Sequence, residues 1–333
     1  MGKARLYAGM VLALSLMGNA WADGYADYPE AQQMAQQLDK EGIRKDWVLQ
    51  VLSQAERKDS ILEAISKPAE RRLNWSEYRK IFLTQARINK GVAFWNANES
   101  ALSRAEAQYG VPAEVIVAII GVETSYGGNM GNYRVVDALS TLGFDYPKRG
   151  EFFRKELANY LRITYKEKLD PLAFKGSYAG AMGYGQFMPS SYLQYAVDFN
   201  GDGVPDIWED PVDAIGSVAN YFAGHGWVAG GVTVLPVMPP AGEGWKSLVQ
   251  TGLKPNTPLN QIRQAGIRVP DFLGNQNGLL MALETDKGQE YWLGLDNFYV
   301  ITRYNHSRHY AMAVYQLAHE VKMARDAAGE KSK

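Results

Sequence analysis

The 333-residue sequence contains no cysteine and only four histidines. Without cysteine the chain forms no disulfide bond and offers no site for a bacterial N-terminal lipid anchor, so its hydrophobic core must hold the fold together. The missing cysteine and the scarcity of histidine together leave little room for a zinc or redox enzyme.

The sequence also lacks an excess of charge and a long hydrophobic run. It has 35 basic and 36 acidic side chains, a formal net charge of −1. Nucleic-acid binding requires a basic surface, so this balance argues against nucleic acid as a partner. No apolar run reaches the roughly 18–20 residues of a membrane span. Hydrophobic residues make up 46% and charged residues 21%, values typical of a folded globular chain.

The first 22 residues have the features of an export signal. Lys3 and Arg5 precede a short apolar stretch from Leu6 to Met17. The motif Ala20-Trp21-Ala22 then fits the small-x-small pattern that signal peptidase cuts. We therefore expect a mature chain that begins at Asp23 and is soluble in the periplasm, with no membrane anchor.

The rest of the chain is predicted to be α+β and mainly helical, in three parts. Residues 23–110 are rich in good helix formers and predict a helical domain, joined by a C-terminal helix over 307–333. Residues 111–229 alternate apolar helices with Gly-rich turns and predict the core. Residues 230–306 contain a Pro- and Gly-rich stretch and predict a small antiparallel β domain.

Two patterns predict individual elements within these parts. A long amphipathic stretch begins at Asn74 or Ser76 and runs toward Tyr109, which predicts a helical region. Residues 279–285 and 290–295 are typical of two strands joined by a short turn.

Glu123 is the sharpest chemical feature. It follows the eight-residue apolar run Val115–Val122, which predicts a buried helix. Burial disfavours the charged form of a carboxyl group, so such a group can hold a proton near neutral pH and act as a general acid. Tyr126, Gly127 and Gly128 follow it and favour an opening rather than more core. The alternative is a glutamate that ends the buried segment and points to water.

A Gly-rich block over residues 176–189 mixes aromatic rings with hydroxyl and amide groups. Rings stack on apolar sugar faces, while Ser177 and Gln186 can hydrogen-bond sugar substituents, so the block suits a sugar site. The alternative is a tight turn between packed helices. Residues 303–307 with Tyr310 form a second polar and aromatic cluster, which either lines a cleft or forms a turn and a helix cap.

Residues 198–209 fit the EF-hand calcium-loop pattern in full, with Gly203 at position six. Oxygen-bearing side chains occupy positions one, three, five, nine and twelve: Asp198, Asn200, Asp202, Asp206 and Glu209. A hard cation needs several oxygens that converge at about 2.3–2.6 Å, and this spacing supplies them. Because the sequence has one such loop and no partner for it, we expect a structural Ca²⁺ site rather than a regulatory one. An acidic loop without metal is the alternative.

In their order and spacing, the motifs of this chain resemble the lytic murein transglycosylase B family over about residues 30–315. The motifs that carry the resemblance are Gly121-Val122-Glu123-Thr124, Phe144-Asp145-Tyr146-Pro147-Lys148-Arg149, the Gly-rich block, Gly201-Asp202-Gly203, Asp210-Pro211-Val212-Asp213-Ala214-Ile215 and His225-Gly226-Trp227. The missing anchor cysteine makes the chain similar to a soluble, non-lipidated member.

The resemblance implies a lysozyme-like catalytic core packed against the helical and β domains. It also implies cleavage of the β-1,4 bond between N-acetylmuramic acid and N-acetylglucosamine in peptidoglycan glycan strands, with a 1,6-anhydro product and Glu123 as the single acid and base. The residues that it places at the substrate are Ser177, Gln186, Tyr221, Tyr304, Asn305, Tyr146, Arg149 and Tyr310. The ligands that it implies for calcium are Asp198, Asn200, Asp202, the Val204 carbonyl and Asp213, whereas the bare EF-hand pattern nominates Glu209, with Asp206 as a further candidate.

Two other functions are compatible with the same motifs. A muramidase would hydrolyse the same bond with water and would need a second carboxylate. Asp137 and Asp145 are the candidates, but the first is better placed to brace a helix and the second lies in a turn before Pro147. A non-catalytic peptidoglycan-binding protein would use the cleft for adhesion alone.

Overall fold

The computed structural model of the chain describes residues 24–66 and 73–331. The predicted signal peptide, residues 1–22, lies outside the described residues. Most described residues are helical, and the strands form one four-stranded and one two-stranded antiparallel sheet. The prediction of a mainly helical α+β chain is therefore confirmed, while the domain boundaries stay a prediction.

The α-helices are α1 (Pro29–Lys40), α2 (Lys45–Ser53), α3 (Asp59–Ser66), α4 (Trp75–Phe82), α5 (Gln85–Ala97), α6 (Glu99–Tyr109), α7 (Ala113–Thr124), α8 (Val135–Asp145), α9 (Gly150–Lys166), α10 (Pro189–Tyr195), α11 (Pro211–Gly224), α12 (Leu259–Gln264), α13 (Asp296–Tyr304) and α14 (Arg308–Lys331). The strands are β1 (Tyr133–Arg134), β2 (Lys175–Gly176), β3 (Val234–Pro236), β4 (Thr257–Pro258), β5 (Asn277–Thr285) and β6 (Gly288–Gly294), and two short 3₁₀ turns are η1 (Gly244–Leu248) and η2 (Asp271–Leu273).

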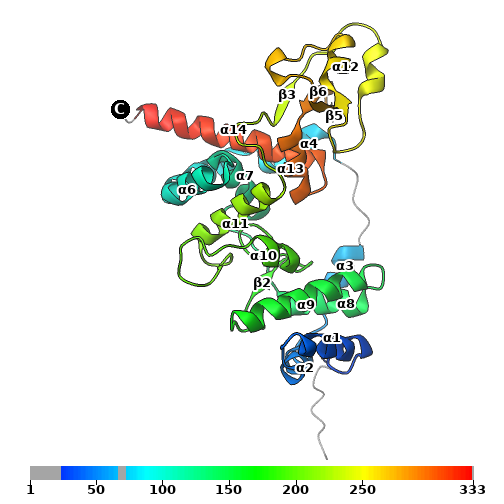
Figure 1. Cartoon of the computed structure of the whole chain (residues 1–333), viewed down its shortest axis with the longest axis vertical. Coiled ribbons are helices and arrows are strands. Elements are labelled where there is room, and N and C mark those ends of the chain that lie inside the picture. Colours follow the sequence, from blue (N-terminus) through cyan, green and yellow to red (C-terminus); the bar gives the residue numbers. More distant parts are fainter. Residues whose placement is uncertain (1–23, 67–72, 332–333) are drawn as a thin grey trace, which may run out of the picture.

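The elements gather in three regions along the long axis of the molecule (Figure 1). At one end α1, α2 and α3 lie beside α8 and α9, and at the other end lies the sheet in the order β3-β6-β5-β4 with α12. Between them α7 packs against α5, α6, α11 and α14. The C-terminal helix α14 also contacts α4 and α13, so the end of the described chain joins elements that are far apart in sequence.

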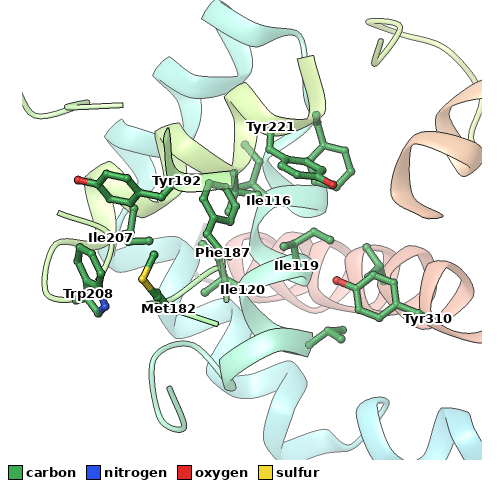
Figure 2. Packing of buried hydrophobic residues seen from close by; sticks show 14 of the residues in the cluster. Ile116, Ile119, Ile120, Met182, Phe187, Tyr192, Ile207, Trp208, Tyr221 and Tyr310 are labelled. Atoms are coloured by element: carbon green, nitrogen blue, oxygen red, sulfur yellow. The ribbon is translucent and has the colours of Figure 1, made fainter. Parts of the chain in front are cut away.

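Helix α7 is the centre of the main hydrophobic core. Apart from Glu114, every residue of Ala113–Val122 is buried, because the helix is apolar on all its faces. Ile116, Ile119 and Ile120 lie between rings from neighbouring elements (Figure 2). The predicted buried helix is confirmed.

The predicted amphipathic stretch toward Tyr109 is helical and is capped by Asn74, and the chain divides it into α4, α5 and α6. The Thr84 side chain accepts a hydrogen bond from the Arg87 N–H at 3.2 Å and so caps a new helix. Asn98, a polar residue outside helical geometry, ends α5 and begins α6. These polar residues interrupt an amphipathic pattern that continues across the breaks.

The two predicted strands are confirmed as a hairpin, with longer strands and a tighter turn than expected. Strands β5 and β6 are joined by Asp286 and Lys287 alone, with Thr285 paired to Gly288. The sheet has a hydrophobic cluster of its own, which includes Trp245 and Leu293.

The tip of this hairpin is held against the start of α4. Asp286 accepts a hydrogen bond from the Asn74 side chain at 3.1 Å and lies 3.5 Å from the Lys80 ammonium group. The Asp286 N–H also donates to the Ser76 hydroxyl at 3.2 Å. These contacts join the β unit to the helical part of the chain.

Over residues 24–66 and 73–331, no single helix is both long enough and apolar enough to cross a membrane. One pair, α6 with α7, meets the length and composition requirements jointly, across a bend of 115°.

Candidate active site

Glu123 lies in the last turn of α7, where the buried helix reaches a sharply turned segment. Ser125, Tyr126 and Gly127 all adopt left-handed backbone conformations, with φ of 52°, 64° and 83°. Two consecutive non-glycine residues in this region cost of order 1 kcal/mol each, so the surrounding packing must hold the turn in place. The helix therefore ends at a fixed point directly after the candidate acid.

Burial raises the pKa of Glu123 from its ordinary value of 4.5 to about 7. The hydroxyl of Tyr310, from α14, donates a hydrogen bond to Glu123 Oε1 at 2.5 Å and lowers the pKa in part. A carboxyl group with a pKa near neutrality can give up a proton and take one back at the same pH. The general acid predicted from the apolar run has the electrostatic setting that this role requires.

Phenol groups from three helices face Glu123. They belong to Tyr78 on α4, Tyr304 on α13 and Tyr310 on α14, and burial raises the pKa of each, with the negative charge of Glu123 adding to the rise. All three therefore stay protonated and uncharged at neutral pH. The sequence predicts Tyr310 within a cleft-lining cluster, whereas its local patterns do not indicate Tyr78.

The Gly-rich block lies beside this site, as the contacts of its backbone show. The Tyr304 hydroxyl donates to the Gly185 carbonyl oxygen at 2.6 Å. Gln186 has a left-handed backbone with φ of 50°, and its side-chain amide donates to the carbonyls of Met130 at 3.2 Å and Gly183 at 3.0 Å. The Ser177 hydroxyl accepts from the N–H groups of Ala179 and Ala181, and so closes its own turn.

Tyr221 and Asn305, two of the residues predicted to contact substrate, differ in their exposure to solvent. Tyr221 is buried, its hydroxyl donates to the Arg303 carbonyl oxygen at 2.8 Å, and its ring lies 4.7 Å from that of Tyr304. Asn305 follows α13 and is exposed. Tyr221 is thus a support for the Tyr304 ring, while the Asn305 amide is open to solvent.

Tyr146 and Arg149 lie in the turn between α8 and α9. The exposed Arg149 guanidinium packs over the rings of Phe152 and Phe153, at 4.5 and 5.1 Å from their centroids. Among the described residues, no hydrogen bond, ion pair or ring contact joins Tyr146 or Arg149 to Glu123. The structure does not bring these two predicted residues into direct contact with the acid.

The two candidates for a second carboxylate are engaged elsewhere. Asp137 is buried, pairs with Arg134 at 2.8 Å and accepts from the Glu56 N–H at 2.9 Å. Asp145 accepts from the Tyr25 hydroxyl at 2.5 Å and from Arg57 at 3.2 Å. Both brace the packing of the N-terminal helices on α8, so neither is free to act beside Glu123.

The acidic loop forms a separate cluster at the start of α11. Asp198, Asp202 and Asp213 each offer a carboxylate oxygen, and these oxygens lie within 4.8 Å of one another. The Asp198 carboxylate accepts from the N–H groups of Gly201, Asp202 and Gly203, which folds the loop around it. Such convergence of hard oxygen ligands suits Ca²⁺.

Asp213 reaches the cluster from the first turn of α11. Its carboxylate accepts three backbone hydrogen bonds, from Phe199 at 2.7 Å, Asn200 at 2.9 Å and Asp206 at 2.8 Å. Burial nevertheless raises its pKa, against the lowering effect of those bonds. Glu209 is exposed and is not in the cluster.

The other loop positions have local partners. Asp206 accepts from the N–H groups of Trp208 and Glu209. The Asn200 amide donates to Asp202 at 3.2 Å and to Asp210 at 2.6 Å, and Val204 donates its N–H to Asp202. The side chains of Asp206 and Asn200 thus form hydrogen bonds with nearby residues of the same loop and the start of α11.

The mainly helical fold of this chain is shared with solved lytic transglycosylases. The chain belongs to the lytic transglycosylase family, since the family model described as Transglycosylase SLT domain matches residues 26–319. It is 48% identical over 312 residues to membrane-bound lytic murein transglycosylase B of Escherichia coli (strain K12), a match that covers 90% of this chain and 85% of that protein.

Two solved structures show the same fold. Soluble lytic transglycosylase SltB1 of Pseudomonas aeruginosa matches with a TM-score of 0.86 and 52% identity, over 90% of this chain and 100% of that one. Lytic transglycosylase Slt35 of Escherichia coli, solved in complex with calcium, matches with a TM-score of 0.83 and 47% identity, over 93% of this chain and 98% of that one. The predicted family and lysozyme-like fold class are confirmed.

Proposed function

We propose that this chain is a lytic murein transglycosylase that cleaves the β-1,4 bond between N-acetylmuramic acid and N-acetylglucosamine, with Glu123 as its single acid and base. The observation that carries the proposal is the setting of Glu123, a desolvated carboxyl group with a pKa of about 7 that is surrounded by neutral phenols. The family of the chain and the name of its 48% identical relative support the same reaction.

The reaction needs a nucleophile that the substrate itself supplies. Protonated Glu123 donates its proton to the glycosidic oxygen as the bond to C1 of the muramic residue breaks. The 2-acetamido group of that residue stabilises the developing cation. Glu123, now a carboxylate, takes the proton from the 6-hydroxyl of the muramic residue. The oxygen of that hydroxyl bonds to C1 at the same time, so a 1,6-anhydro ring forms and Glu123 is protonated again. Proximity favours this internal attack over attack by water.

The engagement of Asp137 and Asp145 supports this route over hydrolysis. A hydrolase that uses two carboxylates places them about 5–5.5 or 6.5–9.5 Å apart. Asp137 is held by Arg134, and Asp145 by Tyr25 and Arg57. A reaction that requires one carboxylate fits the described residues better.

The substrate contacts follow from which polar groups are already engaged. The Tyr221 and Tyr304 hydroxyls donate to backbone carbonyls, so we assign their rings to the wall of the cleft. The Gln186 amide nitrogen already donates to two carbonyls, so Gln186 offers its amide oxygen to sugar substituents. The exposed Asn305 offers its whole amide group, and Ser177, whose oxygen already accepts from two N–H groups, offers its hydroxyl proton. Tyr146 and Arg149 would extend the binding surface along the α8–α9 turn, away from the reacting bond.

The acidic loop would hold Ca²⁺ through three carboxylates and loop oxygens. The Asp198, Asp202 and Asp213 carboxylates fit the ion because their oxygens converge within 4.8 Å, where like charges repel unless a cation lies between them. Asn200 and the Val204 carbonyl would complete the set. Since Asp213 belongs to α11, the ion would tie the loop to that helix and stabilise the fold without taking part in the reaction.

We further infer that the mature chain acts in the periplasm after removal of residues 1–22. The basic start, apolar stretch and Ala20-Trp21-Ala22 motif support export. The absence of cysteine supports a chain without the N-terminal lipid anchor.

Mass spectrometry of the muropeptides that the chain from Asp23 releases from purified peptidoglycan tests this function. Products one water lighter than the hydrolytic species are expected. Products that retain the water would identify a muramidase instead. Binding to the wall material without release would identify a binding protein and overturn the proposed activity.

A further inference from the structure

The hydroxyl of Thr124, the residue after Glu123, makes an unusual set of contacts. Thr124 is fully buried, and its Oγ1 lies 3.1 Å from the Ile120 carbonyl oxygen, one turn back on α7. The same oxygen lies 3.0 Å from the carbonyl oxygen of Tyr184, 60 residues away in sequence. It also accepts a hydrogen bond from the Gly127 N–H at 3.0 Å. One hydroxyl thus joins the helix, the left-handed turn and the Gly-rich block.

The segment of the Gly-rich block that Thr124 contacts is held from both sides. The hydroxyl of Thr124 reaches the carbonyl of Tyr184, and the hydroxyl of Tyr304 reaches the carbonyl of the next residue, Gly185, at 2.6 Å. The following residue is Gln186, which has a left-handed backbone. The two hydroxyls therefore fix the strip of backbone that leads into Gln186.

The turn and the block are also in close van der Waals contact. A Cβ atom on Gly127 would lie 2.4 Å from the ring of Tyr184, and the φ of Gly127 is +83°. A side chain at this position would have to displace the Tyr184 ring and would also be strained by the left-handed backbone. Close packing and the Thr124 hydroxyl thus act at the same junction.

We propose that Thr124 is a positioning residue for Glu123: its hydroxyl fixes the end of α7 against the Gly-rich block, and so sets where the carboxyl group stands relative to the bound sugar. The inference rests on the proposed function. Thr124 does not contact the substrate in this proposal. It acts only through its hydrogen bonds to the backbone of Gly127 and Tyr184. Misplacement of a reacting group by about 1 Å can lower a rate about 100-fold, so a single hydroxyl at this junction has a large effect.

The matched test compares T124V, which keeps the shape and removes the hydroxyl, with T124S, which keeps the hydroxyl. T164V is the control, because Thr164 is also fully buried and its hydroxyl also bonds the carbonyl four residues back, that of Tyr160, but it lies within α9. Release of anhydro-muropeptides is measured against peptidoglycan concentration between pH 5 and 9, together with the Tm of each variant.

We expect T124V to lower kcat about 10- to 100-fold with a smaller change in KM. We also expect the alkaline limb of its pH profile to move to lower pH, because a carboxyl group released toward solvent has a pKa closer to its ordinary 4.5 than to about 7. The phenols that face Glu123, Tyr78, Tyr304 and Tyr310, are unchanged in every variant. T124S should restore both the rate and the profile, and T164V should lower the Tm alone.

The outcomes separate this inference from the proposed function. Wild-type release of anhydro product, with T124V changed only in Tm, would overturn the role of Thr124 and leave the proposed function standing. A wild-type chain that releases no anhydro product would overturn both. Should T124V not fold, T124A removes the hydroxyl with a smaller side chain, and wild-type kinetics from that variant would also overturn the inference.

Discussion

Two groups of carboxylates in this molecule have opposite environments. Glu123 ends a buried helix, has neutral phenols as neighbours and has a pKa of about 7. Asp198 and Asp202, in the acidic loop, lie together with Asp213, in the first turn of α11, and each accepts hydrogen bonds from backbone N–H groups. One carboxyl group without charged neighbours is suited to exchange a proton, whereas three charged ones together are suited to hold a cation.

The difference shows that the neighbours of a carboxylate decide its chemistry. Burial without a hydrogen-bond donor network disfavours charge, and Tyr310 offsets that effect only in part. Hydrogen bonds from backbone N–H groups favour the charged form of a carboxylate, and the buried Asp213 accepts three of them. The same chemical group is therefore suited to act as an acid at one place and as a metal ligand at the other.

The largest expected effect is that of E123Q on turnover. Glutamine has the size of glutamate but neither gives nor accepts the proton, so the rate of anhydro-muropeptide release should fall at least about 10³-fold while the fold is kept. Circular dichroism checks the fold, and E114Q, at the other end of α7, should keep full activity. An active E123Q enzyme would remove Glu123 from the reaction.

The substitution D213N, at the acidic loop, should lower the stability of the fold and should not act on the reaction directly. The amide cannot replace a carboxylate that accepts three N–H bonds, so a loss of about 3 kcal/mol in the free energy of unfolding is expected. The rise in Tm on addition of Ca²⁺ should also disappear. E209Q should keep that rise, because Glu209 is exposed and outside the cluster. The reverse result for the two variants would show that Glu209 closes the site.

The buried acid should make stability depend on pH in a defined direction. The folded state binds the Glu123 proton up to about pH 7, while the unfolded chain loses it near 4.5. The native state therefore loses up to about 3 kcal/mol of stability as the pH rises through this window. Urea unfolding at pH 5 and pH 8 should show that E123Q lacks this loss, whereas E114Q retains it. Parallel behaviour of E123Q and the wild type would contradict the raised pKa.

The smallest effect concerns the Tyr310 hydroxyl. Its hydrogen bond lowers the pKa of Glu123, so Y310F should raise that pKa further and move the alkaline limb of the activity profile to higher pH. Loss of the bond should also cost about 1–2 kcal/mol in the free energy of unfolding. Y160F removes a buried tyrosine hydroxyl that donates to Pro171 in another region, and should lower stability without moving the profile. A downward shift in Y310F would contradict the assigned donor.

Local patterns in the sequence predict both carboxylate sites. The run Val115–Val122 is apolar without a polar face, which requires burial wherever the helix lies, so the pattern makes Glu123 a candidate acid; the family resemblance then favours it over a glutamate that points to water. The alternating oxygens from Asp198 onward predict the loop, since EF-hand spacing is a short-range property. The hairpin of β5 and β6 is predictable for the same reason.

The features that the sequence does not predict depend on contacts between distant segments. Tyr78 lies close enough for the charge of Glu123 to raise its pKa only because α4 packs on α14. No local sequence pattern identifies Tyr78 as part of the site. The EF-hand pattern nominates Glu209, but Asp210 caps α11 and Pro211 begins it, which places Asp213 in the cluster and leaves Glu209 outside. The family resemblance indicates Asp213, which loop spacing does not.

Helix α14 has a consequence for the order in which the molecule becomes active. It comes after every other element in the described chain, yet it packs on α4, α5 and α7 and supplies the Tyr310 hydroxyl to Glu123. A nascent chain that has been synthesised only as far as α13 has neither a completed central core nor the Tyr310 hydroxyl that hydrogen-bonds Glu123. The core around Glu123 and the hydrogen bond to its carboxyl group are therefore completed only when the last helix of the described chain has been synthesised and has packed.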